Sequence, residues 1–136
     1  MAQQKKLQYS AVILAAGKGT RMKSPLPKVL HPVAGEPMIS KIVRACQQAE
    51  IQDVRVVLGH GQALVKSVLE NSQVSIFSQV QQLGTADAVR SAQPESFNER
   101  VLILNGDHPL IEAADLEKIL KEFGSQFWMM LYSELN

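Results

Sequence analysis

The stretch AVILAAGKGTRM, residues 11–22, decides the fold class of this chain. It begins as a run of small and β-branched apolar side chains, a pattern typical of a buried strand. The run then passes into a turn that holds Gly17, Gly19 and the cation Arg21. A strand that stops in a glycine-rich, basic turn usually meets an anion, and the rest of the sequence must indicate which one.

Short apolar runs alternate with amphipathic stretches along the chain. The runs at residues 11–15, 54–58, 74–77 and 101–104 are bounded by turn residues, which predicts strands. The stretches at residues 37–50, 62–71, 85–91 and 112–123 have helical spacing, with Pro37 in a first turn and Gly124 as a stop. This alternation predicts an α/β fold, a Rossmann-like open, mostly parallel sheet with helices on both faces.

The length of 136 residues corresponds to one domain, or to a piece of one. We expect residues 1–136 to form a single domain, with residues 1–9 as a flexible tail. The last segment, FWMMLYSELN at residues 127–136, is typical of a fifth strand with no closing helix after it. Two interpretations of this ending stay open, a domain cut short at its C-terminus and a final edge strand.

The composition is that of an ordinary globular protein and excludes several classes of partner. Hydrophobic residues make up 46% and charged residues 20% of the chain, and the formal net charge is only +1. This charge leaves no large basic surface for a nucleic acid, so we expect a small anionic ligand. The apolar run at residues 11–16 is too short for a signal peptide or a membrane span, which favours a cytoplasmic protein without membrane contact.

The single cysteine, Cys46, excludes an internal disulfide and a multi-cysteine zinc site. It shares one predicted helical face with Ile39, Ile42 and Val43. We therefore expect a thiol packed in the core, and a reactive thiol is the alternative.

In an open α/β sheet, ligands bind outside the carboxyl ends of the strands, near the point where the strand order reverses. The loops that leave the predicted strands at this edge are residues 16–32, 59–61, 78–85 and 105–109, all rich in glycine, amides or charge. We expect the chemistry in these loops. The exception is the tight GHG turn at residues 59–61, where His60 is expected to be structural.

The first of these loops matches neither of two common nucleotide motifs. Met22 stands where a Walker loop needs its second glycine and where a dinucleotide fingerprint needs its third. Gly17 and Gly19 still let backbone N–H groups converge on a phosphate. Arg21 and Lys28 can add full charges to the same phosphates, so we interpret the loop as a phosphate cradle. The alternative is a plain turn with solvated lysines.

A lone acid follows the fourth predicted strand in the sequence LNGDHPL. Asp107 comes just after Gly106, on the ligand side of the sheet. A single carboxylate that faces a polyphosphate is a usual way to hold Mg²⁺, which keeps several waters. The alternative is that Asp107 forms an Asx turn or caps the next helix. His108 is expected to be a packing or surface residue.

A group of primary amides, Gln79, Gln81 and Gln82, precedes the third predicted helix. Amides offer paired donors and acceptors that match the edge of a nucleobase. Gly84 permits close backbone approach, and Thr85 is expected to cap the helix. The alternative is a polar loop with a helix cap and no ligand.

Three segments together resemble the sugar-1-phosphate nucleotidyltransferases. They are LAAGKGTRMKSPLPKVLHPVAGEPMI at residues 14–39, QLGTADAV at residues 82–89 and LNGDHPLI at residues 104–111. Within that family, the chain is most similar to the uridyltransferase domain of the bifunctional enzymes that make UDP-N-acetylglucosamine. The run LPKVLHPVAG is the most specific part of the resemblance, which extends from residue 11 to residue 136.

The resemblance implies a role for each matching residue. Backbone groups at the end of the first strand would contact uracil and ribose, the amide loop would recognise uracil, and Asn105 and Gly106 would lie near the ribose and sugar. The implied substrate-binding residues are Leu14, Ala15, Ala16, Gly17, Gly19, Gln79, Gln82, Gly84, Thr85, Asn105 and Gly106. Arg21 and Lys28 would be catalytic cations on the triphosphate, and Asp107 would be a Mg²⁺ ligand.

The implied reaction is nucleotidyl transfer from UTP to N-acetylglucosamine-1-phosphate, a step in making peptidoglycan for the cell wall. In such enzymes, the acetamido-sugar pocket, a second metal ligand and a trimer-forming β-helix come from later segments, which this chain lacks. A homo-oligomer is therefore expected only in a longer parent protein. Two alternatives stay open, a nucleotidyltransferase for another base or sugar and a non-catalytic nucleotide-binding fragment.

Overall fold

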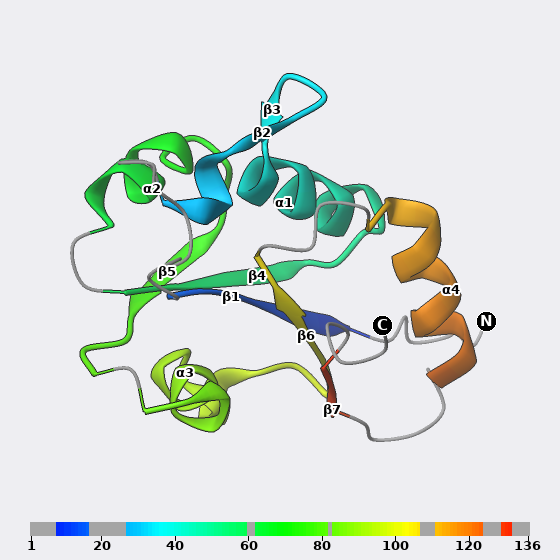
Figure 1. Cartoon of the computed structure of the whole chain (residues 1–136). Coiled ribbons are helices and arrows are strands. Elements are labelled where there is room, and N and C mark those ends of the chain that lie inside the picture. The colour runs from blue at the N-terminus through cyan, green and yellow to red at the C-terminus, as the bar shows by residue number, and fades with distance from the viewer. Residues whose placement is uncertain are drawn as a thin grey trace.

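The computed structural model describes residues 8–16, 27–59, 62–81, 83–106, 111–123 and 129–131. These residues build a five-stranded sheet in the order β5-β4-β1-β6-β7, in which all neighbouring strands are parallel (Figure 1). The strands are β1 (Tyr9–Ala15), β4 (Asp53–Leu58), β5 (Ser75–Ser78), β6 (Arg100–Asn105) and β7 (Met129–Leu131). The predicted α/β class with a parallel sheet is confirmed.

β1 lies at the centre of the sheet because it pairs with β4 on one side and with β6 on the other. Its residues Ala11, Val12 and Ile13 are completely buried. A central strand covered on both faces has no polar face, which is the physical reason for its unbroken apolar sequence.

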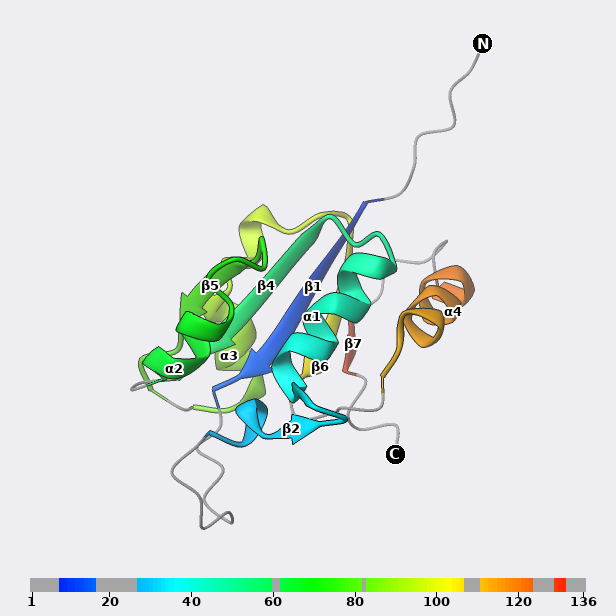
Figure 2. The ribbon, with the colours of Figure 1, turned by 90° about the horizontal axis from the view of Figure 1, so that it is seen from above.

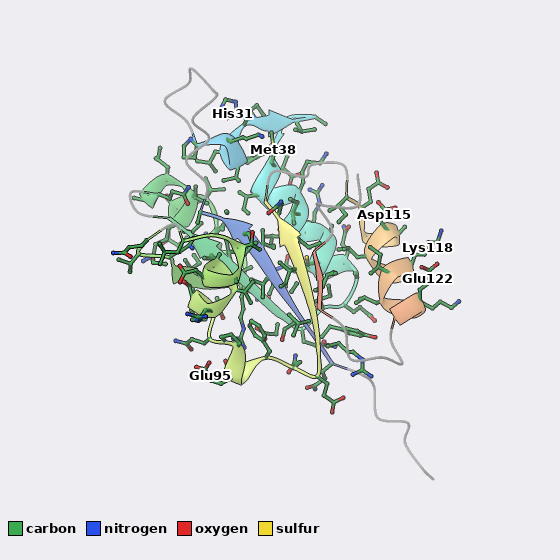
Figure 3. All side chains as sticks on the ribbon, turned by 60° about the horizontal axis from the view of Figure 1, so that its bottom comes forward. His31, Met38, Glu95, Asp115, Lys118 and Glu122 are labelled. Carbon is green, nitrogen blue, oxygen red and sulfur yellow. The ribbon has the colours of Figure 1, made fainter. Side chains whose placement is uncertain are left out.

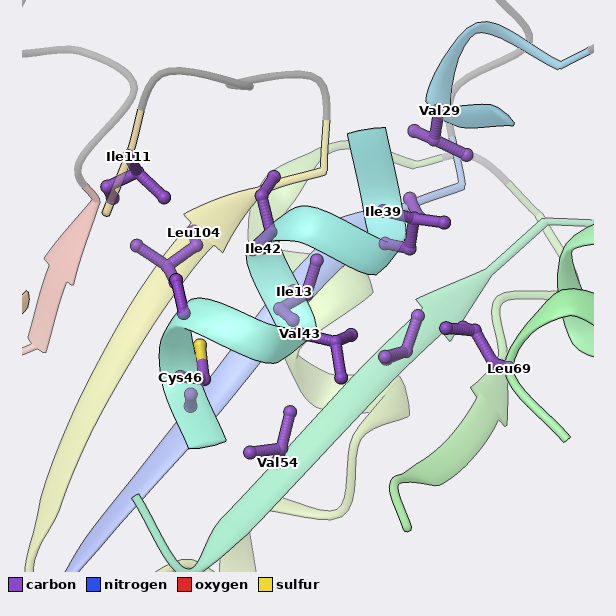
Figure 4. Close-up of a cluster of buried hydrophobic side chains, with 14 of the residues drawn as sticks. Ile13, Val29, Ile39, Ile42, Val43, Cys46, Val54, Leu69, Leu104 and Ile111 are labelled. Carbon is purple, nitrogen blue, oxygen red and sulfur yellow. The ribbon is translucent and has the colours of Figure 1, made fainter. Parts of the chain in front are cut away.

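Helices cover both faces of the sheet, as predicted. One face carries α1 (Met38–Gln48), α2 (Ala63–Val68) and α4 (Ala113–Phe123), and the other carries α3 (Thr85–Ser91) (Figures 1 and 2). Figure 4 shows side chains of α1, among them Ile39 and Cys46, directed at the strands beneath the helix. The outer face of α4 is charged, with Asp115, Lys118 and Glu122 exposed along it (Figure 3).

The segment between β1 and α1 is more structured than the sequence suggested. It contains a 3₁₀ turn, η1 (Lys28–Leu30), and a short antiparallel hairpin of β2 (Pro32–Val33) and β3 (Glu36–Pro37). The prediction that Pro37 lies in the first turn of the helix is wrong. Its ψ angle of 140° is extended, so Pro37 ends β3 and directly precedes α1.

Smaller differences concern the ends of elements. Tyr9, the last residue of the segment expected to be a tail, is already the first residue of β1, and residues 1–7 lie outside the described part of the chain. A second 3₁₀ turn, η2 (Pro94–Ser96), precedes β6. β7 lies within the segment predicted as a fifth strand and pairs with β6. Gly124, predicted to stop the last helix, falls outside the described residues. No helix within the described ranges is long and apolar enough to cross a membrane.

One buried cation ties β4 to the far end of α3. The Arg55 side chain is 8% exposed, and its Nη2 lies 2.9 Å from Oδ2 of Asp53. Its Nη1 donates to the carbonyl oxygens of Ala92 (2.7 Å) and Gln93 (2.9 Å), and its Nη2 donates to that of Ser96 (2.7 Å). The guanidinium also lies 4.7 Å from the ring centre of Phe97, a favourable cation–π geometry. A charge buried on a strand is tolerated here because its donors have acceptors.

We expect Arg55→Ala to lower the free energy of unfolding by about 3–5 kcal/mol, because it leaves a partly buried carboxylate and several carbonyl groups without their donor. Urea denaturation followed by circular dichroism measures this change. The matched control is Arg44→Ala, which removes the exposed ion pair with Glu36 and should cost less than about 1 kcal/mol. Equal losses in the two variants would contradict the structural role of Arg55.

Cys46 is expected to be inert in the folded chain, since burial raises the pKa of its thiol to about 12 from the ordinary 9.0. The native protein should not react with Ellman's reagent at pH 8, whereas the urea-unfolded chain should release one equivalent. As the pH rises from about 9 towards 12, the unfolded thiol ionises and the native thiol does not, so stability should fall. Rapid reaction of the native protein would contradict this packing.

Candidate functional site

The strand order reverses at β1, and in open α/β sheets ligands bind at the carboxyl ends of the strands on either side of such a reversal, here β1 and β6. After β1, the next two strands of the sheet, β4 and β5, are added on one side of β1. The strands β6 and β7 are then added on its other side. The register aligns Leu14 with Asn105 in the pair of β1 and β6. It also aligns Ala15 with Leu58, and Leu58 with Ser78. The loops after all four strands therefore begin at one edge of the sheet.

Gly106 closes the contact between β1 and β6 at this edge. Its N–H donates to the carbonyl oxygen of Leu14 over 2.8 Å. A Cβ atom at this position would lie 3.1 Å from that oxygen and 3.2 Å from both Ala15 Cβ and Val29 Cγ1. Only a glycine fits without displacing its neighbours, so the predicted importance of Gly106 has a steric cause in the structure.

The carboxyl end of β1 is packed into the protein. Ala15 and Ala16 are buried, and Leu14 is half-buried against the cluster on the α3 side of the sheet. Asn105, the last residue of β6, is half-buried beside Leu14. The structure thus brings Leu14, Ala15, Ala16, Asn105 and Gly106 together, as the sequence predicted.

Lys28 lies on η1, close to the same edge. Val29 and Leu30 are buried and anchor this turn, and Val29 is the residue that borders Gly106. The Lys28 side chain is exposed. η1 therefore lies beside the carboxyl ends of β1 and β6, and Lys28 is its first residue.

The amide loop after β5 is built around Gln79. Its backbone N–H donates to the Leu58 carbonyl oxygen over 2.7 Å, which continues the pairing of β5 with β4. The residue as a whole is only 3% exposed. The side-chain Nε2 donates to the Gly84 carbonyl oxygen (3.3 Å) and to Oδ2 of Asp87 (2.9 Å). Gln79 thus belongs to the wall of the site, whereas Gln81 is exposed.

The expected helix cap is wrong in one detail. Thr85 is the first residue of α3, and the N-cap position belongs to Gly84, which makes no side-chain cap. Gly84 has φ +106°, a conformation that L side chains rarely adopt, so a glycine is needed at this position. Thr85 itself is exposed.

Two features of this loop were not anticipated from the sequence. One is Asp87, whose only signal was an acid in the first turn of a predicted helix. The other is apolar exposure, since Val80, between Gln79 and Gln81, is 85% exposed, and Leu83, after the last glutamine, is 70% exposed. Exposed apolar side chains in a polar loop are typical of a surface that contacts a ligand or partner.

Several predicted site residues lie outside the described part of the chain. They are Gly17, Gly19, Arg21, Gln82 and Asp107; His60 and His108, which were not predicted to be site residues, also lie outside it. Within the described ranges, no group of three or more histidine, cysteine or acidic side chains is placed to hold a metal ion. Asp107 is not among the residues of those ranges, so its role as a metal ligand stays a prediction.

Comparison with known proteins gives the family. Residues 11–134 match the model of the MobA-like NTP transferase domain. The chain is 58% identical over 114 residues to the bifunctional protein GlmU of Bdellovibrio bacteriovorus, covering 84% of this chain and 25% of that protein. It is 48% identical over 129 residues to GlmU of Azotobacter vinelandii, covering 95% and 28%. The chain thus spans about a quarter of the length of these curated relatives.

Solved structures agree with the fold. A putative glucose-1-phosphate thymidylyltransferase from Bacillus anthracis superposes with a TM-score of 0.73 at 30% identity, over 87% of this chain and 51% of that one. A nucleotidyl transferase from Methanothermobacter superposes with a TM-score of 0.72 at 27% identity, over 84% and 57%. With the match over residues 11–134, these likenesses establish that the chain belongs to the MobA-like NTP transferase domain family.

Proposed function

We propose that this chain serves uridylyl transfer from UTP to N-acetylglucosamine-1-phosphate, which gives UDP-N-acetylglucosamine and pyrophosphate for peptidoglycan synthesis. The observation that carries the proposal is the gathering of Leu14, Gly106 and Gln79 at one sheet edge, in a chain 58% identical to a GlmU protein. Gln79 follows β5, two strand spacings or about 10 Å from β1. A nucleoside that spans this distance would place its base at Gln79 and its phosphates at the end of β1.

The base would be read by one acceptor and one donor that the loop leaves available. Among the described residues, neither Oε1 of Gln79 nor the N–H of Gly84 has a hydrogen-bond partner. Uracil presents a donor, N3–H, beside an acceptor, O4, which is the complementary pair. Gln82 and Thr85 belong to the same proposed recognition set.

The phosphates would lie over the turn that follows β1. Backbone N–H groups from Gly17 to Gly19 and the cations Arg21 and Lys28 would balance the charge of the triphosphate. Ala15 and Ala16, together with Asn105, would form the floor beneath the ribose. The support for Lys28 is its position on η1 beside Gly106; the roles of Gly17, Gly19 and Arg21 rest on the sequence.

Asp107 fits a metal site by its chemistry. It directly follows Gly106, whose backbone is held against Leu14 at the crevice, and one carboxylate together with substrate phosphates is a donor set that Mg²⁺ accepts. When bound, Mg²⁺ supplies charge neutralisation at the phosphates. The preference for Mg²⁺ over other divalent ions is part of the proposal.

The chemistry asks little of a general base, because the attacking phosphate oxygen of the sugar phosphate is already an anion. It attacks the α-phosphorus of UTP, the bond to the β-phosphate breaks, and pyrophosphate leaves. The residues of this chain would orient the two anions and balance their charge, which is how most phosphoryl-transfer sites work. Loss of one well-placed donor to the leaving group costs about 3 kcal/mol in comparable sites.

Two other functions are the alternatives. The two structural neighbours named above include a putative glucose-1-phosphate thymidylyltransferase, so transfer of another nucleotide or to another sugar phosphate is the nearest alternative. The second alternative is a nucleotide-binding module without turnover. Release of pyrophosphate on addition of the sugar phosphate distinguishes an enzyme from such a module. A cytoplasmic location and a homo-oligomeric longer parent are further parts of the proposal.

The proposal predicts selective binding of UTP. Calorimetric titration of the chain with UTP, CTP, ATP, GTP and NADH, each with Mg²⁺ present, should give the lowest Kd for UTP and no binding of NADH. The physical reason is the acceptor–donor pair of Gln79 and Gly84 for the base and the missing third glycine for a dinucleotide. Equal affinity for all triphosphates, or no affinity for any, would contradict the function.

Gly106→Ala is predicted to weaken UTP binding and to lower stability. The added methyl group must push apart Leu14, Ala15 and Val29, and overpacking of this kind typically costs about 1–3 kcal/mol. The melting temperature and the Kd for UTP are the measurements. Gly35→Ala is the control, because its Cβ would meet nothing within 4 Å and its cost comes only from φ +83°. That variant should lose stability but keep its affinity, and a normal Kd in Gly106→Ala would argue against a site at this edge.

A further inference from the structure

The side-chain amide of Gln79 is oriented by Asp87, a residue to which the proposed function assigns no role. Its Nε2 group lies 2.9 Å from Oδ2 of Asp87 and 3.3 Å from the carbonyl oxygen of Gly84. Both partners are oxygen acceptors, and a carboxylate can only accept. The Nε2 group therefore uses its two hydrogens on these two acceptors. The carbonyl oxygen, Oε1, has no hydrogen-bond partner among the described residues.

The opposite orientation of the amide is unfavourable. Rotation by 180° would place Oε1 of Gln79 against the carboxylate of Asp87 and the carbonyl of Gly84, so three acceptors would face one another. Since Gln79 as a whole is only 3% exposed, little water reaches the amide to relieve that repulsion. Asp87 thus fixes which end of the amide is available to a ligand.

Asp87 is well placed to stay in this position. It is the third residue of α3, in the first turn, where the helix dipole favours a negative charge. Its backbone carbonyl oxygen accepts from Ser91 Oγ over 3.0 Å. The helix packs against the buried side of β1 and β4, with Ala88 and Val89 in the core. The carboxylate is therefore held by a rigid element.

We propose that Asp87 is a positioning residue that sets base specificity, by holding the Gln79 amide with its carbonyl oxygen towards the base. The inference rests on the proposed function, in which Gln79 meets the N3 edge of a pyrimidine. Uracil carries a hydrogen at N3 and can donate to Oε1, whereas the N3 atom of cytosine is itself an acceptor and is repelled. Asp87, three residues after Gly84, would thereby favour a base that carries a hydrogen at N3, although Asp87 itself does not contact the base.

Removal of the acceptor at position 87 tests this role. In Asp87→Ala the amide of Gln79 can rotate, so the ratio of the CTP and UTP dissociation constants should fall about tenfold, the value of one directed hydrogen bond. A loss of stability alone would weaken the binding of both nucleotides equally and leave the ratio unchanged. Asp87→Leu, which keeps the bulk without an acceptor, should give the same fall.

Asp115→Ala is the matched control, because Asp115 is likewise the third residue of its helix and accepts from a backbone N–H, that of Glu112, over 3.0 Å. It lies on α4, on the opposite face of the sheet from α3 (Figures 1 and 3). Its loss should leave the nucleotide ratio unchanged. A fall equal to that of Asp87→Ala would overturn the specific role of Asp87.

The wild-type chain separates failure of the inference from failure of the proposed function. A wild type without preference for UTP over CTP would overturn both. A wild type that prefers UTP, with Asp87 variants that keep its ratio, would overturn only the role of Asp87.

Amide exchange measured by NMR is a test that needs no variant at position 87. The two Nε2 hydrogens of Gln79, assigned by their loss in Gln79→Glu, should exchange slowly, and rapid exchange of both would overturn the inference.

Discussion

The pairing of β1 with both β4 and β6 is the constraint on which the rest of the structure depends. It makes β1 the strand at which the sheet order reverses, and so it decides at which edge of the sheet a ligand site is expected. The close approach of Gly106 to Leu14 is the last contact of that pairing. Because that contact leaves no room for a side chain, a glycine is needed where the end of β6 meets β1.

The second constraint is how α3 is held. At its carboxyl end, Arg55 donates to the carbonyl oxygen of Ala92, the residue that follows the helix. At its amino end, Gln79 donates to Gly84 and Asp87. Both anchors come from neighbouring strands or their loops, so the helix is fixed to the sheet at two points. A recognition loop attached to a helix held in this way keeps its geometry before any ligand arrives, which lowers the cost of binding.

The sequence was sufficient for the features that depend on local pattern. The apolar run of β1, the helix at residues 85–91 and the parallel order all follow from periodicity and turn residues, and the structure has α3 at the same bounds. The sequence was insufficient for residues whose role depends on a contact with a distant part of the chain. The acceptors of Arg55 lie about 40 positions further along the chain, and Pro37 joins a hairpin because Pro32 pairs with it. Asp87 acts through a neighbour eight positions earlier, across a loop in which neither strand nor helix periodicity applies.

These observations place stability and recognition in one set of hydrogen bonds. A buried amide whose two hydrogens are bonded and whose oxygen has no described partner is a cost to the folded chain. Stability of the folded chain alone would favour an apolar side chain at position 79, like those at the neighbouring core positions of β4. The cost is consistent with a ligand that supplies the missing donor, since binding then gains a hydrogen bond without first breaking one to water. A partly satisfied amide held by a charged neighbour is therefore better explained by recognition than by packing.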